Sequence, residues 1–108
     1  MNHFNKLNEI SLEELIPRLG DEALKILDVR ESWEMPKVDH QDVINISVQQ
    51  IELSLDQIPT TTELIVVCQH GIRSVHVIKL LQNRYNFTNL VNLKGGIENY
   101  TLLTTRTV

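Results

Sequence analysis

The chain lacks the features that mark several large classes of protein. It holds 1 cysteine among its 108 residues, so an internal disulfide is excluded. No run of about 18 apolar residues occurs, and we therefore expect no membrane span. Residues 1–8 lack the apolar core of a secretory signal, so we expect a reducing, cytoplasmic location. The sequence also shows no repeat, low-complexity stretch or long linker.

Basic charge is scarce as well. The 10 Lys and Arg residues are scattered and are outnumbered by 14 Asp and Glu residues, which gives a net charge of −4. Nucleic-acid binders usually show a basic excess or stripe, so we expect no nucleic-acid partner. A composition of 42% apolar and 22% charged residues is ordinary for a globular domain. We predict a flexible segment over residues 1–8 and a single domain over residues 9–108.

The cysteine stands at the end of an apolar run. Residues 64–67 are Leu-Ile-Val-Val, Cys68 follows, and a polar turn with Gly71 leads at once into a helical pattern. This order is typical of a buried parallel strand that delivers Cys68 to a strand-to-helix loop. A lone cysteine is commonly an inert core residue, but α/β proteins keep their chemistry in such loops. We therefore predict that Cys68 is a nucleophile.

A loop of this kind favours negative charge. Backbone N–H groups and the positive end of the helix dipole can lower the pKa of a thiol and hold an anion. Arg73 adds a permanent cation, and Gly71 allows a backbone conformation that a side chain would hinder. We predict that Ser74 is the N-cap of the following helix.

Strand and helix patterns alternate along the rest of the chain. We expect strands near residues 9–10, 24–30, 42–47, 64–67 and 89–93. Capping-box patterns at residues 11–14 and 47–50 predict helices that end near Gly20 and Pro59, although Pro17 bends or shortens the first. A longer helix should end near Asn86. Right-handed crossovers would join the strands into a mostly parallel sheet, with the active loops at one edge.

The cysteine loop carries a family resemblance. It is similar to the active-site loop of the rhodanese family of sulfurtransferases in the run Cys68-Gln69-His70-Gly71-Ile72-Arg73-Ser74. The related cysteine phosphatases place five residues between cysteine and arginine, whereas this chain has four, and the tighter cradle suits sulfur better than phosphate.

Two flanking segments support the resemblance. Asp28, Arg30 and Glu34 match an Asp-x-Arg…Glu pattern, and the pair Gly95-Gly96 resembles the turn into a final helix that ends near an aromatic residue, here Tyr100. Residues 38–43 depart from the family's glycine-histidine-isoleucine-proline-glycine-alanine run. His40 therefore cannot be equated with the family's histidine, and we expect an exposed loop residue.

The resemblance implies a fold and a reaction. The fold is α/β and rhodanese-like, with about five strands in a mostly parallel sheet and helices on both faces. In the implied ping-pong reaction, the Cys68 thiolate takes sulfur from thiosulfate, a small anionic donor, or from a persulfide donor. Cys68 becomes a persulfide, which the N–H groups of residues 69–73 stabilise. Cyanide or a thiol then removes the sulfur, and no metal or organic cofactor is needed.

The resemblance also assigns supporting roles. Arg30 and Glu34 should pair and brace the loops, with Asp28 close to the cysteine loop, while Arg73 stabilises that loop and assists anion capture. Gln69 offers no charge where some relatives carry a cation.

Several alternatives stay open. The first alternative to a sulfurtransferase is a persulfide carrier or docking module with a protein partner in thiolation or cofactor assembly. The second is a small phosphatase or arsenate reductase. His70 either tunes the thiolate or contacts the donor, or it faces solvent while its backbone N–H serves the loop. His76 is expected on the surface.

Overall fold

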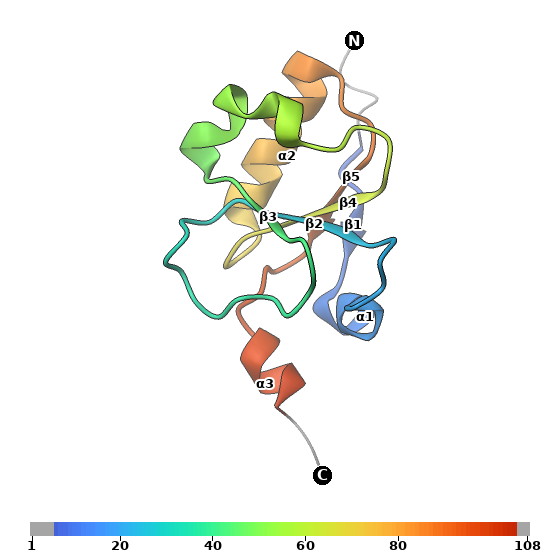
Figure 1. The fold of residues 1–108 in the computed structure, drawn as a ribbon, viewed down its shortest axis with the longest axis vertical. Coiled ribbons are helices and arrows are strands. Elements are labelled where there is room, and N and C mark those ends of the chain that lie inside the picture. The colour runs from blue at the N-terminus through green and yellow to red at the C-terminus, as the bar shows by residue number, and fades with distance from the viewer. Residues whose placement is uncertain (1–5, 106–108) are drawn as a thin grey trace.

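The computed structural model describes residues 6–105, which form a five-stranded sheet (Figure 1). All adjacent strands pair in parallel, in the order β1-β5-β4-β2-β3. The strands are β1 (Glu9–Ile10), β2 (Lys25–Asp28), β3 (Ile44–Asn45), β4 (Leu64–Val67) and β5 (Leu90–Leu93). The helices are α1 (Leu12–Leu15), α2 (Ile72–Tyr85) and α3 (Tyr100–Thr104), with 3-10 segments η1 (Ile16–Arg18), η2 (Val48–Leu53) and η3 (Leu55–Gln57). The predicted α/β architecture is confirmed.

Helices lie on both sides of the sheet (Figure 1), and each face of the sheet has its own hydrophobic core. On one face, Val77 and Leu81 of α2 and Ile51 of η2 pack with Val66 of β4. On the other face, side chains from α1 and α3 pack with residues that include Ile65 and Val67. Because side chains of a strand alternate between the two faces, the continuous apolar run 64–67 supplies both cores. Because β4 is buried on both faces, its position in the sheet is fixed, and so is the position of Cys68, which directly follows it.

The first helix is shorter than the pattern suggests. Its capping box forms as predicted: the Glu14 N–H donates to Ser11 Oγ, and the Ser11 N–H donates to Glu14 Oε1. The α-helical turns end at Leu15, and Pro17 lies in the 3-10 segment that follows. Proline cannot donate the next helical hydrogen bond, which explains the early change of geometry.

The second predicted helix is not an α-helix. Residues 48–57 form two 3-10 segments, and the Gln50 N–H donates to the Ser47 backbone carbonyl, three residues back. Ser54 lies between the two segments with φ −129° and ψ 24°, outside the helical region, so a continuous α-helix cannot form. The strand predicted at 42–47 is likewise only Ile44–Asn45.

The final helix was placed too early. We expected it to end near Tyr100, but α3 begins there, because residues 95–99 are turns. The Tyr100 ring is buried, and its hydroxyl accepts a hydrogen bond from the Asp39 N–H at 2.8 Å. Tyr100 thereby ties the C-terminal helix to the irregular segment 31–43.

The N-terminal segment is described only in part. Residues 1–5 and 106–108 lie outside the described residues, and so does most of the segment predicted to be flexible. Within residues 6–8, the Lys6 carbonyl accepts a hydrogen bond from Gln82 Nε2, and Leu7 packs against the core. Where the structure describes the chain, no helix has the length and apolar character needed to span a bilayer.

Candidate functional site

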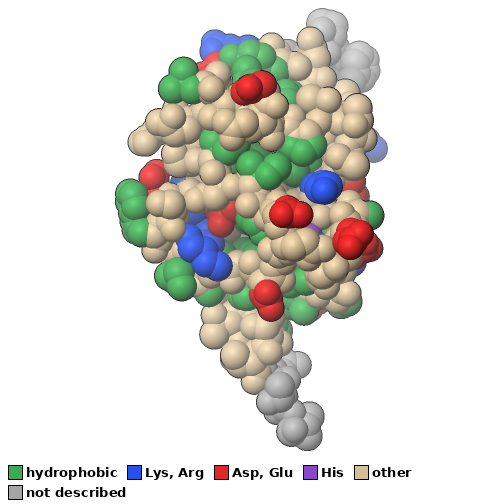
Figure 2. All heavy atoms as spheres, in the orientation of Figure 1, with side chains coloured by type: hydrophobic (Ala, Val, Ile, Leu, Met, Phe, Trp, Pro, Cys, Tyr) green, Lys and Arg blue, Asp and Glu red, His purple; other side chains and the backbone are tan. Residues whose placement is uncertain are grey.

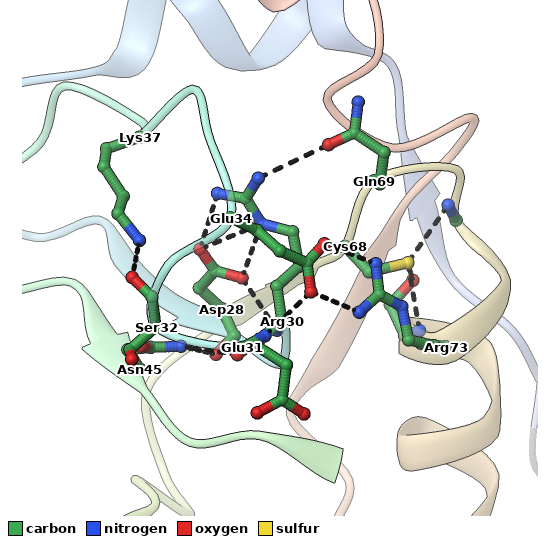
Figure 3. A network of polar contacts seen from close by, with 12 residues as sticks. Asp28, Arg30, Glu31, Ser32, Glu34, Lys37, Asn45, Cys68, Gln69 and Arg73 are labelled. Carbon is green, nitrogen blue, oxygen red and sulfur yellow. Dashed lines mark hydrogen bonds and ion pairs between the residues drawn. The ribbon is translucent and has the colours of Figure 1, made fainter.

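The candidate site lies where β2 and β4 end. The two strands are parallel neighbours, with Asp28 beside Val67, so the segments that follow them leave the sheet at the same edge. β2 continues into the segment that carries Arg30 and Glu34, and β4 continues into the cysteine loop (Figure 3). The expected convergence of these segments at one edge of the sheet is observed.

Two backbone N–H groups point at the Cys68 sulfur. The Gly71 N–H donates to Sγ with an N···S distance of 3.1 Å, and the Ser74 N–H does so at 3.3 Å. Both amides belong to the beginning of α2, whose dipole has its positive end here. The prediction had placed the donors within residues 69–73; Gly71 fits, and Ser74 lies one residue beyond. Cys68 itself is 1% exposed.

Close backbone packing keeps the cysteine loop tight. Gly71 has φ +84°, and a Cβ there would lie 3.0 Å from the Gly95 nitrogen. Gly96 has φ +70°, and a Cβ there would lie 2.3 Å from the Gln69 carbonyl oxygen. The glycine turn therefore lies directly against the cysteine loop, and the Ile97 N–H donates to the Cys68 carbonyl at 3.0 Å. Only glycine fits at Gly96, and a side chain at Gly71 would be crowded and strained by the positive φ.

Ser74 has a different role from the one predicted. Gly71 is the N-cap and α2 begins at Ile72, so Ser74 is inside the first turn rather than before it. Its buried hydroxyl lies 3.3 Å from Cys68 Sγ and donates to Asn92 Oδ1 at 2.5 Å. The helix starts earlier because Gly71, in the left-handed conformation, can end the loop itself. Ser74 is thus a direct neighbour of the sulfur.

Arg30 joins three segments around the site. Its fully buried guanidinium binds Asp28 through Nε and Nη2, at 3.1 and 3.0 Å. Nη2 also donates to the Pro36 carbonyl at 2.7 Å, and Nη1 donates to Gln69 Oε1 at 3.4 Å (Figure 3). Arg30 does connect the loops, as predicted. The prediction that it pairs with Glu34 was wrong, because its ion-pair partner is Asp28. Side chains two residues apart at a strand end lie on the same face, so Arg30 folds back onto Asp28.

Glu34 binds Arg73 instead. The carboxylate accepts from both terminal guanidinium nitrogens, at 2.7 and 2.8 Å, across the gap between the two loops (Figure 3). These hydrogen bonds lower the pKa of Glu34 to about 2, helped by the Glu31 N–H and by the charges of Arg73 and Arg30. The same contact raises the pKa of Arg73, and a thiolate at Cys68 would act in the same direction. The Arg73 cation and a Cys68 anion would therefore stabilise each other.

Three histidines differ in exposure and in hydrogen bonding. His70 is exposed, and its Nδ1 lies 2.8 Å from Glu98 Oε1, so its side chain is directed at the glycine turn. His76 is exposed, as expected. The expectation for His40 was wrong: it is half-buried, accepts the Gly20 N–H at Nδ1 and bonds the Leu24 carbonyl through Nε2. His40 closes the turn before β2.

Asn92 was missed by the sequence analysis. It is buried on β5, where its amide joins Ser74 to Glu9 of β1, with Nδ2 donating to Glu9 Oε2 at 2.9 Å. The available signal was a polar residue inside the otherwise apolar run Leu90–Leu93. Across residues 6–105, the structure offers no group of three or more His, Cys, Asp or Glu side chains that could hold a metal ion.

The family follows from comparison with known proteins. A model of the rhodanese-like domain matches residues 11–103. The match covers the whole sheet except its first strand, and it includes the cysteine loop. The chain therefore belongs to the rhodanese-like domain family.

Its relatives include proteins named for sulfur chemistry. The chain is 29% identical over 98 residues to YrkF of Bacillus subtilis (strain 168), provisionally named a sulfur carrier protein; the match covers 90% of this chain and 52% of YrkF. It is also 29% identical over 93 residues to YtwF of the same organism, provisionally named a sulfurtransferase, covering 85% of this chain and 88% of YtwF. The chain thus spans about half the length of YrkF.

Solved structures share the fold. A rhodanese-related protein from Thermoplasma volcanium superposes with a TM-score of 0.75 at 24% identity, covering 94% of this chain and 97% of that one. Together with the family match, this likeness confirms the rhodanese-like fold.

Proposed function

We propose that the protein is a sulfurtransferase that carries sulfane sulfur on Cys68. One observation carries the proposal: the Cys68 sulfur accepts hydrogen bonds from the N–H groups of Gly71 and Ser74 at the start of the 14-residue helix α2. Such donors favour a thiolate over a thiol, and they favour an anionic persulfide for the same reason. The Arg73 charge nearby acts in the same direction.

The first half-reaction loads the cysteine. The Cys68 thiolate attacks the outer sulfur of thiosulfate, the S–S bond of the donor breaks, and sulfite leaves with the bonding electron pair. Because Cys68 is 1% exposed, the site favours a donor whose reacting sulfur projects from a small group. Arg73 can exchange one of its hydrogen bonds to Glu34 for one to the donor anion.

The second half-reaction unloads it. A nucleophile such as cyanide or a thiol attacks the terminal sulfur of the persulfide, and the Cys68 thiolate is the leaving group. The atoms and charges balance without a metal or an organic cofactor. The amides that stabilise the starting thiolate also stabilise this leaving group.

A persulfide carrier for a protein acceptor is the second candidate. The similarity to YrkF supports it. So do two exposed apolar side chains, Trp33 and Ile72, which are 74% and 75% exposed and adjoin Glu34 and Arg73 in the chain. An acceptor protein could cover such side chains when its nucleophile reaches Cys68.

Turnover assays separate these functions. The sulfurtransferase proposal predicts continuous formation of thiocyanate from thiosulfate and cyanide, and its loss in Cys68→Ala. A carrier would load one sulfur per chain and release it slowly to cyanide and small thiols. Release of phosphate from an aryl phosphate, or reduction of arsenate, would instead support the phosphatase or reductase class.

A further inference from the structure

A chain of hydrogen bonds runs from the Cys68 sulfur, at the end of the central strand β4, across β5 to the edge strand β1. It passes from Cys68 Sγ to Ser74 Oγ, then to Asn92 Oδ1, and from Asn92 Nδ2 to Glu9 Oε2. Cys68, Ser74 and Asn92 are all buried, and Glu9 is exposed at the far end. Glu9 and Asn92 are paired residues of β1 and β5, so the backbone fixes their separation. We call these four residues the relay.

The direction of each hydrogen bond in the relay is determined by Glu9. An ionised carboxylate only accepts hydrogen bonds, so the Asn92 amide must turn its NH₂ group toward Glu9. Asn92 Oδ1 then faces Ser74, and it takes the single hydrogen of the Ser74 hydroxyl at 2.5 Å. Ser74 is left with only lone pairs to offer Cys68, which must therefore be the donor and carry its proton.

Two influences thus act on Cys68 in opposite directions. The N–H groups of Gly71 and Ser74 favour the thiolate, whereas the relay favours the thiol. We propose that Glu9 and Asn92 are positioning residues that hold the Ser74 hydroxyl away from Cys68 and so limit ionisation of the resting thiol. When Cys68 loses its proton to solvent, the Ser74 hydroxyl has to leave Asn92 to donate to the sulfur.

Other charged groups around Cys68 do not belong to the relay. Arg73 on α2 is paired with Glu34, and Asp28 and Arg30 pair at the end of β2 (Figure 3). His70 is paired with Glu98 at the outer side of the loop. All six are retained in the variants below, so they contribute equally to every profile that is compared.

The test is the pH profile of Cys68 alkylation by iodoacetamide. In Glu9→Gln the new side chain can donate as well as accept, so Asn92 can turn over and release the Ser74 hydroxyl to the sulfur. We expect the midpoint of the profile to fall by about half a pH unit, which is about a threefold higher rate well below the midpoint. Glu13→Gln, in the first turn of α1, removes the same charge from another exposed position and should leave the midpoint unchanged.

Repeating the Glu9→Gln change in a Ser74→Ala variant separates an effect of the relay from an effect of the lost charge. In Ser74→Ala there is no hydroxyl to direct, so adding Glu9→Gln should no longer shift the midpoint. If Ser74→Ala does not fold, Glu9→Asp serves instead: it keeps the charge but shortens the side chain, so the relay predicts a shift of the midpoint and a pure charge effect predicts none. The proposal is overturned if Glu9→Gln leaves the midpoint unchanged, if its shift persists in Ser74→Ala, or if Glu9→Asp leaves the midpoint unchanged.

This inference rests on the proposed function for its significance, because it concerns the reactivity of the proposed nucleophile. Alkylation needs no sulfur donor, however, so the two can fail separately. A normal relay with no sulfur transfer would refute only the function. Sulfur transfer with an unaltered alkylation profile in Glu9→Gln would refute only the relay.

Discussion

Arg73 and Glu34 form a two-point ion pair between the cysteine loop and the segment after β2, with N···O distances of 2.7 and 2.8 Å. The pair holds the permanent cation of the loop in place and occupies two of its five N–H donors. Under the proposed function, a small anionic donor would meet a cation that Glu34 already neutralises. Figure 2 shows acidic and basic side chains interspersed over the visible face of the protein, so charge of one sign does not dominate that face.

Arg73→Ala should affect sulfur loading more than folding. The side chains of Arg73 and Glu34 are 39% and 23% exposed, and ion pairs near the surface contribute about 1 kcal/mol or less. Loss of a cation beside a developing anion costs a reaction about tenfold or more. We expect the loading rate with thiosulfate to fall by that factor, while urea unfolding changes little. Equal losses in rate and stability would make Arg73 a purely structural residue.

Glu34 should make the stability of the protein depend on acidic pH. Its folded pKa is about 2, below the ordinary 4.5, so the ionised form stabilises the fold above pH 4.5. That contribution is lost progressively as the pH falls from 4.5 toward 2. The difference in unfolding free energy between the native protein and Glu34→Gln should accordingly shrink over this range.

Urea unfolding at pH 7, 4.5 and 3 measures this change. The matched control is Glu63→Gln, which breaks the more exposed ion pair between Glu63 and Arg18. The side chain of Arg18 is 40% exposed and that of Glu63 is 52% exposed. Its effect should be smaller at pH 7. A difference for Glu34→Gln that stays constant with pH would contradict the assignment.

Arg30→Met should destabilise the fold strongly. The change leaves the buried Asp28 carboxylate without its partner, and breaking a buried ion pair typically costs about 3–5 kcal/mol. Adding Asp28→Asn should recover part of the loss, because the neutral amide no longer needs a charge partner. Unfolding in urea tests both variants, and a loss below about 1 kcal/mol for Arg30→Met would refute this role.

Gly96→Ala should disrupt the cysteine loop, whereas Gly95→Ala should not. Both glycines have positive φ, so both variants pay a strain of about 1–3 kcal/mol. Only at Gly96 would the new Cβ meet the backbone of Gln69, at 2.3 Å; at Gly95 it meets no atom within 4 Å. Gly96→Ala should thus lose a further 1–3 kcal/mol or so in urea unfolding and load sulfur more slowly. Equal effects at the two glycines would contradict this account.

Local patterns in the sequence were sufficient to place the proposed nucleophile in the fold. The run 64–67 had to be buried on both faces, and Gly71 allowed a tight turn after it, so Cys68 could be assigned to a loop above the sheet. The first capping box was equally local, and it was predicted correctly. Such features depend on residues within about one turn of each other.

Partners far apart in the sequence could not be predicted in the same way. Glu34 binds Arg73, 39 residues away, and Ser74 binds Asn92, 18 residues away, and both pairs depend on where neighbouring strands and loops end. Three acidic residues, Asp28, Glu31 and Glu34, lie within four residues of Arg30, and only the fold shows that Arg30 binds Asp28. The 3-10 geometry of residues 48–57 was also hidden, because apolar spacing does not separate it from an α-helix.

The most direct test of the central claim is the intact mass of the chain after incubation with thiosulfate. We predict that the native protein gains the mass of one sulfur atom, that cyanide or a reductant removes it, and that Cys68→Ser gains nothing. An unchanged native mass, or the same gain in Cys68→Ser, would contradict the assignment of Cys68 as the sulfur carrier.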